Sequence, residues 1–213
     1  MPCLFLICAH NGSDLISLKR KLGFYSMLIK LQNFLLLAAA AVAIFSASTF
    51  ALGQEDGYTP AFDVGSGESD WWTVYPDQHE NATLSVEHPD WVLDELKDRP
   101  LLILVHSSNC VPCLVQIPRI ESAVDRFGDS ISYHDVLAEG AGFKEAVEIL
   151  NVYDPRGGKQ YVPTNIFITL AEGPEGKAEV AWHSKTDIMS QEDIDSYMED
   201  AIYYHKKNLD SWD

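Results

Sequence analysis

Two cysteines, Cys110 and Cys113, stand two residues apart where the sequence predicts the start of a helix. A thiol in the first turn of a helix faces unpaired backbone N–H groups and the positive end of the helix dipole, which favour its thiolate form. A second thiol one turn further on can close a disulfide with the first. The spacing is therefore suited to dithiol–disulfide exchange.

A buried strand and a long helix must position this pair. Residues Leu101–Val105 form an apolar run between polar flanks, which is typical of a central strand. The helix that follows Cys110 contains Pro118, which should kink it, and Gly128, which should end it. Its apolar residues recur at helical spacing and predict the face that packs on the sheet: Leu114, Ile117, Ile120, Val124 and Phe127.

Alternating strand and helix signals predict the rest of the architecture. The predicted helices are Pro89–Asp98, Phe143–Leu150 and a last one that Ser190 caps and that ends near Lys206. The predicted strands are Ile131–Val136, Asn165–Thr169 and Ala178–Trp182, with short ones at Trp71–Tyr75 and Thr83–Val86. The strand–helix–strand unit around the cysteines predicts a parallel pair with a right-handed crossover.

This order of elements, with Cys-x-x-Cys opening the second helix, resembles the thioredoxin family over about residues 82–205. Pro118 stands five residues after Cys113, as the kinking proline of that family does, and Val162-Pro163-Thr164 resembles its cis-proline segment. The resemblance implies an α/β protein with the thioredoxin fold, three-layer α/β/α with a mixed central sheet. Trp71–Tyr75 would add an N-terminal strand extension.

The resemblance also implies roles for single residues. Cys110 would be the exposed nucleophile that attacks a substrate disulfide, and Cys113 would resolve the mixed disulfide. Pro163 should be cis and, with Val162 and Thr164, should bind the substrate beside the sulfur pair. The Cys110–Cys113 disulfide would be the redox group, and no cofactor is expected.

The sequence departs from the family pattern at the positions that tune the cysteines. Leu104 replaces the buried aspartate that cytosolic thioredoxins carry six residues before the first cysteine, and Asn109 replaces their tryptophan. The usual Gly-Pro dipeptide is Val111-Pro112, in which Pro112 lacks an N–H and is pre-set for a helix start. Val111 and Pro112 are therefore candidates for tuning the redox properties of the pair.

The base that would deprotonate Cys113 is consequently missing or replaced. Asp135 and His134 on the neighbouring strand are the candidates, and the one that faces the motif would take the role. His106, four residues before Cys110, either tunes the cysteine or has a purely structural role. We assign Asp135 and His106 to the redox-tuning group.

Three functions compete for this motif. The first is an exported thiol–disulfide oxidoreductase that reduces protein disulfides, since Val111-Pro112 lacks the histidine of strongly oxidising dipeptides; it would take electrons from a donor such as a membrane thiol carrier. The alternative is a thioredoxin-like binding domain whose disulfide is structural and redox-inactive. A zinc module is disfavoured, because a structural site needs four ligands and the body offers two cysteines; no metal is expected.

Charge excludes one class of partner. The chain has a formal net charge of −17, and its first 51 residues carry four basic groups against Asp14 alone. The remaining residues therefore hold 11 basic and 31 acidic groups, a net charge of −20. Such a surface repels phosphate backbones, so we expect no nucleic-acid partner.

The N-terminal stretch predicts export. Lys30 precedes an apolar block, Phe34–Phe45, and small residues that end at Ala51, which together are typical of a cleaved signal beginning at Met1 or Met27. An uncleaved membrane anchor is the alternative, because Phe34–Leu52 nearly spans a bilayer. Both place the body outside the cytoplasm. The expected organisation is 1–51 signal or anchor, 52–70 acidic linker and 71–213 thioredoxin-like domain.

Overall fold

A computed structural model of the chain describes residues 57–173 and 176–212. The predicted export signal or anchor, residues 1–51, lies outside the described residues. The described fold belongs to the unit that begins at Tyr58. Within the described part of the chain, no helix has both the length and the apolar character needed to cross a membrane.

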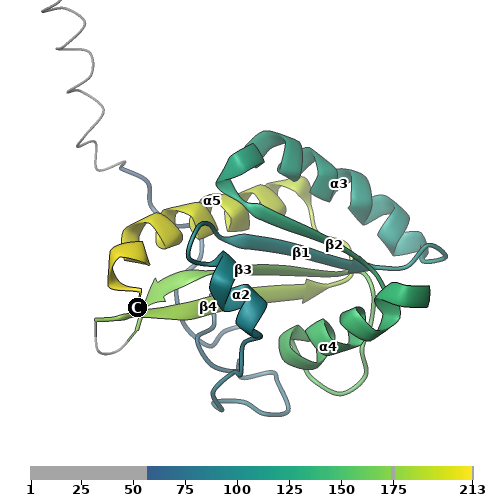
Figure 1. The fold of residues 1–213 in the computed structure, drawn as a ribbon, viewed down its shortest axis with the longest axis horizontal. Coiled ribbons are helices and arrows are strands. Elements are labelled where there is room, and N and C mark those ends of the chain that lie inside the picture. The colour runs from purple at the N-terminus through teal and green to yellow at the C-terminus, as the bar shows by residue number, and fades with distance from the viewer. Residues whose placement is uncertain (1–56, 174–175, 213) are drawn as a thin grey trace, which may run out of the picture. The chain divides into compact units, whose positions relative to one another are not determined.

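A four-stranded mixed sheet forms the centre of the molecule (Figure 1). Its strands are β1 (Leu101–His106), β2 (Ser132–Leu137), β3 (Thr164–Glu172) and β4 (Ala178–Thr186), in the order β2-β1-β3-β4. β1 pairs in parallel with β2 and antiparallel with β3, which pairs antiparallel with β4. The parallel pair around the cysteine helix is confirmed.

Four α-helices lie on the two faces of this sheet: α2 (Asp90–Glu95), α3 (Val111–Phe127), α4 (Phe143–Tyr153) and α5 (Gln191–Asn208). α3 and α5 cover one face, and α2 and α4 cover the other (Figure 1). Three short 3₁₀ turns complete the described elements: η1 (Gly128–Ser130), η2 (Gly140–Gly142) and η3 (Leu209–Ser211). The predicted three-layer α/β/α architecture is confirmed.

All residues of β1 are buried, because helices cover both faces of this central strand. Leu101, Ile103 and Val105 face the core beneath α2 and α4, whereas Leu102 and Leu104 face the core beneath α3 and α5. The strand is therefore held from both sides. This buried strand positions His106, its last residue, and the loop that follows it to Cys110.

The cysteine helix has the predicted ends, and four of the five residues of the predicted stripe pack in the core beneath α3 and α5: Ile117, Ile120, Val124 and Phe127. It begins after Cys110 and ends at Gly128, whose φ of 49° lies in the region that glycine tolerates. Its fully buried side chains are Cys113, Gln116, Ile120 and Ala123. The prediction that Leu114 belongs to the packed stripe is wrong, because its side chain is 60% exposed.

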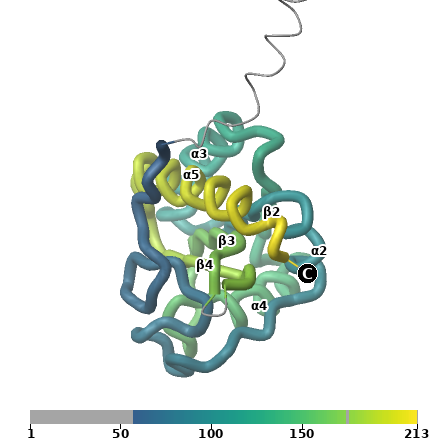
Figure 2. The backbone as a smooth tube through the Cα atoms, turned by 90° about the vertical axis from the view of Figure 1, so that its left-hand side faces the viewer, coloured from purple at the N-terminus to yellow at the C-terminus, as the bar shows by residue number. Residues whose placement is uncertain are grey.

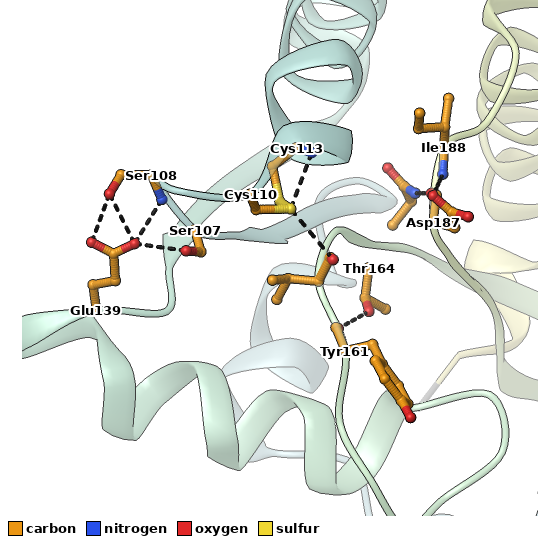
Figure 3. Close-up of a disulfide and its surroundings, with 11 residues drawn as sticks. Ser107, Ser108, Cys110, Cys113, Glu139, Tyr161, Thr164, Asp187 and Ile188 are labelled. Atoms are coloured by element: carbon orange, nitrogen blue, oxygen red, sulfur yellow. Dashed lines mark hydrogen bonds between the residues drawn. A yellow bond between two sulfur atoms is a disulfide. The ribbon is translucent and has the colours of Figure 1, made fainter.

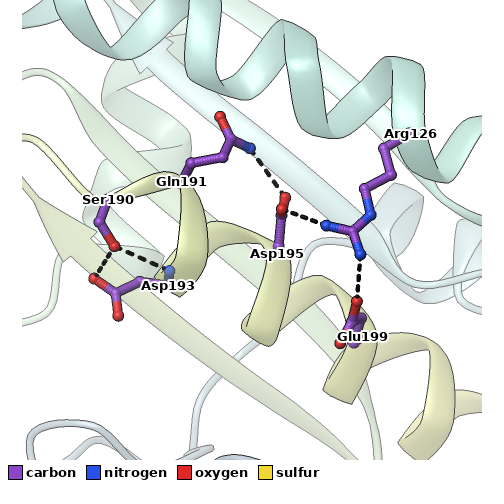
Figure 4. A network of polar contacts seen from close by, with 6 residues as sticks. All are labelled: Arg126, Ser190, Gln191, Asp193, Asp195 and Glu199. Atoms are coloured by element: carbon purple, nitrogen blue, oxygen red, sulfur yellow. Dashed lines mark hydrogen bonds and ion pairs between the residues drawn. The ribbon is translucent and has the colours of Figure 1, made fainter.

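The far end of α3 is fastened to α5 by charge (Figure 4). The Arg126 guanidinium forms ion pairs with the carboxylates of Asp195 and Glu199. The α5 helix begins as predicted, with the Ser190 hydroxyl accepting the Asp193 N–H at 3.0 Å. These contacts join the two helices that share one face of the sheet.

The N-terminal part of the unit lies against the fold but forms no full strand. Where a strand was predicted at Trp71–Tyr75, isolated bridges join Trp72 to Trp182 and Val74 to Ser85. The N-terminal extension is therefore made of isolated bridges, and the one between Trp72 and Trp182 joins it to β4. A strand needs a neighbouring strand that pairs with it over several consecutive residues. The aromatic composition of this segment does not by itself provide such a neighbour.

Residues 58–70, assigned by sequence to a linker, run beside α5 (Figure 2). One buried carboxylate, that of Asp200, accepts hydrogen bonds from the Tyr58 hydroxyl at 2.6 Å and from the N–H groups of Ala61 and Phe62 at 2.9 Å each. The ring of Phe62 stacks on Tyr197 with centroids 3.9 Å apart. The segment is thus tied to the domain by specific contacts.

Candidate redox site

The two predicted cysteines form a disulfide at the N-terminus of α3, with Cα atoms 5.1 Å apart (Figure 3). Cys110 is the N-cap residue and is partly exposed, whereas Cys113 in the first turn is fully buried. The Cys113 N–H donates to the Cys110 sulfur at 3.2 Å. The accessible sulfur is therefore the one that a backbone donor and the helix N-terminus face.

The segment that precedes β3 lies beside the disulfide. The Val162–Pro163 peptide bond is cis, as the sequence predicts. The Val162 carbonyl oxygen lies 3.5 Å from the Cys110 sulfur (Figure 3). Thr164 is buried, and its hydroxyl donates to the Tyr161 carbonyl at 2.7 Å. The structure thus brings Val162 to the sulfur pair and uses the Thr164 side chain to hold the turn; their substrate-binding roles remain predictions.

A second turn supports this segment from behind. The Asp187 N–H donates to the Pro163 carbonyl at 2.8 Å, and the Asp187 carboxylate accepts the Ile188 N–H at 2.8 Å (Figure 3). Asp187 has φ of 81°, a conformation that aspartate tolerates better than most residues with a side chain. The link between β4 and α5 therefore fixes the position of Pro163.

A carboxylate also fixes the loop that leads into Cys110. Glu139, which follows β2, accepts the Ser107 hydroxyl at 2.7 Å, the Ser108 N–H at 2.6 Å and the Ser108 hydroxyl at 2.9 Å (Figure 3). These donors, the Ser107 hydroxyl first, lower the pKa of the Glu139 carboxyl from its ordinary value. Sequence reasoning missed this contact, which joins residues 31 positions apart.

Two buried amides link the cysteine helix to the segment after Pro163. The Gln116 side chain donates to Asn165 at 2.8 Å and accepts the Met189 N–H at 2.9 Å. Asn165 in turn donates to the carbonyls of Lys185 and Asp187 at 3.1 Å each. Sequence reasoning missed both amides. The available signal was the position of Gln116, one turn after Cys113 on the same helical face.

The two residues that the sequence offered as the missing base lie on opposite faces of the sheet. Leu104 is fully buried and pairs in register with Asp135 on β2, so both side chains lie on the face that α3 covers. His134 points to the opposite face, where its ring lies 2.9 Å from Glu95 and 4.9 Å from the Trp91 ring. Asp135, and not His134, therefore shares a face with the cysteine helix.

His106 is the partner of Asp135. It ends β1, is 9% exposed, and places its Nε2 atom 2.9 Å from a carboxylate oxygen of Asp135. The Asp135 side chain is 57% exposed, so the carboxylate lies at the rim and the imidazole lies inside. The structure brings these two predicted redox-tuning residues together.

Exposed apolar side chains surround the disulfide. Val111 and Leu114 in the first turn of α3 are 73% and 60% exposed, and Tyr161 and Ile188 from the flanking turns are 54% and 40% exposed. Pro112 occupies the first turn of α3, where its missing N–H costs nothing. The redox tuning expected from Val111 and Pro112 remains a prediction. In residues 57–173 and 176–212, no three acidic, His or Cys side chains form a group able to hold a metal ion.

Comparison with known proteins gives similarity at the level of structure. No protein-family model matches the sequence, and no curated protein matches it. A solved structure of thioredoxin O2 from Arabidopsis thaliana is 20% identical, with 52% of this chain and 83% of that chain covered and a TM-score of 0.35. The exposed lipoprotein thioredoxin of Streptococcus pneumoniae is 19% identical, with 50% and 88% covered and a TM-score of 0.37. A thiol:disulfide interchange protein of the thioredoxin family from Chlorobium tepidum is 15% identical, with 51% and 83% covered and a TM-score of 0.35.

Proposed function

We propose that this protein, whose fold is the thioredoxin fold, is an exported thiol–disulfide oxidoreductase that reduces protein disulfides through Cys110 and Cys113. One observation carries the proposal. Cys110 is partly exposed, and its sulfur accepts a backbone hydrogen bond from Cys113 and lies beside the Val162 carbonyl. A disulfide that served only to stabilise the fold would gain nothing from this access.

The reaction proceeds in two exchange steps. The Cys110 thiolate attacks one sulfur of the substrate disulfide, which forms a mixed disulfide and releases the other substrate sulfur as a thiolate. Cys113 then loses its proton and attacks the Cys110 sulfur. The second substrate thiol leaves, and the Cys110–Cys113 disulfide remains. Two electrons pass from the protein to the substrate, and the two released thiolates take up protons.

Local structure favours this division of roles. The Cys113 N–H stabilises negative charge on the Cys110 sulfur, since hydrogen bonds to charged acceptors are stronger than those to neutral ones. Burial of Cys113 keeps its thiol away from external disulfides until Cys110 has reacted. The carbonyl of Val162 can receive an N–H of an extended substrate segment beside the attacked sulfur.

The reducing direction and the location rest on sequence. Val111-Pro112 lacks the histidine of strongly oxidising dipeptides, and the protein would be re-reduced by a donor dithiol, for which a membrane thiol carrier is the candidate. The predicted export signal, with Lys30, the apolar block Phe34–Phe45 and the small residues up to Ala51, would direct the thioredoxin-like domain out of the cytoplasm. Cell fractionation tests this: we expect the body outside the cytoplasm, and its recovery in the cytosol would refute export.

Reduction of insulin with dithiothreitol as the electron donor tests the activity. We expect the wild-type chain to accelerate insulin precipitation and the Cys110→Ser variant to do no more than the donor alone. Lys144→Gln is the control and should match the wild type, because the Lys144 side chain is 87% exposed and pairs with Glu148 on its own helix. A folded wild-type protein without activity would favour the alternative, a binding domain with a structural disulfide.

A further inference from the structure

We propose that His106 and Asp135 act as a pair that accepts the proton of Cys113 when this thiol attacks the mixed disulfide. The inference rests on the proposed exchange reaction and assigns its missing base. Three observations support the proposal: the positions of the two residues, the buried imidazole without a hydrogen-bond partner in the described part of the chain, and the apolar residue Leu104.

The first support is position. His106 is the last residue of β1, and the strand alternation places it on the same face as Leu102 and Leu104, which pack beneath α3 and α5. Cys113 lies on the buried face of the first turn of α3, and the short loop 107–110 joins the strand to that turn. Imidazole and inner thiol therefore share one face and one end of the sheet.

The second support is the unsatisfied state of the imidazole. The His106 Nε2 atom lies 2.9 Å from the Asp135 oxygen, which is ion-pair distance, but the geometry does not make an aligned hydrogen bond. Its Nδ1 atom is buried and has no hydrogen-bond partner among the residues that the structure describes. A buried polar atom without a partner is costly, and a histidine kept only for packing could be replaced by an apolar residue. In the tautomer that carries its proton on Nε2, Nδ1 offers the lone pair that a proton acceptor requires.

The third support is that Leu104, an apolar residue, occupies the position of the expected buried carboxylate. Leu104 stands where the thioredoxin resemblance implies a buried carboxylate, and it pairs with Asp135 on β2 and with Asn165 on β3. At this register position the carboxylate is therefore on the edge strand β2 instead of on the central strand β1. A carboxylate at the rim needs an intermediary to reach the inner thiol, and His106 lies between the rim and the interior.

The surroundings of His106 hold few other charges. From β2 it meets Asp135, to which the Tyr133 hydroxyl donates at 3.3 Å, and from the following loop it feels the Glu139 carboxylate. The buried side chains on the first turns of α3 are Cys113 and the neutral Gln116, and β3 contributes the neutral Asn165. The charged groups that face His106 are therefore these two carboxylates, and Cys113 is the titratable group on the α3 side.

The proton follows a balanced route. In the mixed disulfide, neutral His106 takes the Cys113 proton at Nδ1, and the Asp135 carboxylate, 2.9 Å from Nε2, stabilises the imidazolium that forms. The Cys113 sulfur forms its bond to Cys110 as the bond from Cys110 to the substrate sulfur breaks. The departing thiolate then takes the proton from the imidazolium, directly or through water, and His106 is neutral again. No additional oxidant or reductant is needed.

A single-turnover experiment isolates this step. The full chain with Cys3→Ser and Cys8→Ser is reduced, freed of reductant and mixed with Ellman's reagent. Cys110 releases the first thionitrobenzoate, and attack by Cys113 releases the second. The rate of the second release is measured by stopped flow from about pH 5 to 9, the range in which histidine changes charge.

The pair should control the pH profile of this second release. We expect His106→Gln to slow it about tenfold or more near neutral pH and to remove the inflection due to the imidazole. Asp135→Asn should slow it less, because it removes the orienting carboxylate and keeps the acceptor. His134→Gln is the matched control: it breaks a similar histidine–carboxylate pair, with Glu95, on the opposite face, and should leave the profile unchanged.

Other results would overturn the assignment. Wild-type profiles in both His106→Gln and Asp135→Asn would do so, as would an equal change in His134→Gln. If His106→Gln fails to fold by circular dichroism, His106→Asn and Asp135→Asn decide. The outcome is separable from insulin reduction: an inactive protein whose second release still depends on His106 refutes the proposed function alone, whereas normal insulin reduction with an unchanged profile refutes the pair alone.

Discussion

The backbone N–H of Cys113 donates to the sulfur of Cys110 across 3.2 Å, so the buried cysteine supplies a stabilising contact to the exposed one. In the reduced protein this donor would meet a thiolate and would strengthen. Cys113 itself is fully buried in the helix. The two thiols therefore differ in both accessibility and charge stabilisation.

This asymmetry predicts which thiol reacts first. Limiting iodoacetamide, added to the reduced protein, should label Cys110 in preference to Cys113, as peptide mass mapping would show. Cys113→Ser should trap a mixed disulfide with a substrate through Cys110, and Cys110→Ser should not. Preferential labelling of Cys113 would reverse the roles that we assign.

Removal of the Glu139 carboxylate should loosen the loop that carries Cys110. Glu139→Ala leaves the Ser108 N–H without its acceptor, so exchange of this amide with deuterium should become faster. In the wild type the same change should appear in acid: the folded pKa of Glu139 is lowered, so the contact is present above the ordinary carboxyl pKa and is lost as pH falls through the folded value. Glu148→Ala, which removes an exposed contact to Lys144 on α4, is the control and should leave Ser108 exchange unaltered.

Asp200 should be a large single contributor to stability at the N-terminal edge. The two carboxylate oxygens of Asp200 accept the N–H groups of Ala61 and Phe62, one each, so Asp200→Asn turns a donor toward one of these N–H groups; we expect the free energy of unfolding to fall by about 2 kcal/mol or more. Urea denaturation would measure the loss. Asp210→Asn near the exposed C-terminus is the matched control and should change stability by less than about 0.5 kcal/mol.

His183 should make the fold sensitive to acid. Burial lowers the pKa of His183 to about 3, although its ring donates to the Asp70 carbonyl at 3.0 Å. Because the unfolded state binds this proton near pH 6.5, the unfolding free energy should decrease as pH falls below about 6.5, down toward about 3. His183→Phe should lose less stability than the wild type between about pH 7 and 4.5, measured by urea denaturation at each pH. An equal loss in both proteins would contradict this origin.

Sequence predicted those parts of the fold that single residues determine through their local backbone or side-chain chemistry. Gly128 ends α3 and Ser190 caps α5 as predicted, because a left-handed residue and a capping hydroxyl act locally. The pairing of Cys110 with Cys113 also followed from their spacing, whereas the cis bond before Pro163 was implied by the thioredoxin resemblance. The helix end, the cap and the cysteine pairing are each decided within a few residues of chain.

The features that sequence could not supply depend on distant partners. Leu114 was placed in the packed stripe by its apolar character, whereas the polar Gln116 occupies the core because Asn165 satisfies its amide. Asp200 becomes an anchor only when Ala61, 139 positions earlier, lies against it. Helical periodicity ranks residues by polarity and does not show which polar groups will find partners inside.

The pairing of Trp72 with Trp182 has a practical consequence for spectroscopy. Their ring centroids lie 4.9 Å apart, Trp71 precedes Trp72 in sequence, and the loops beside the disulfide contain no tryptophan. The indole of Trp72 also donates to the Gly67 carbonyl at 2.7 Å, within the segment that lies along α5. We therefore expect the emission of Trp71, Trp72 and Trp182, which adds to that of Trp91 and Trp212, to change when that segment detaches, and total tryptophan emission to change little with the oxidation state of the two sulfurs.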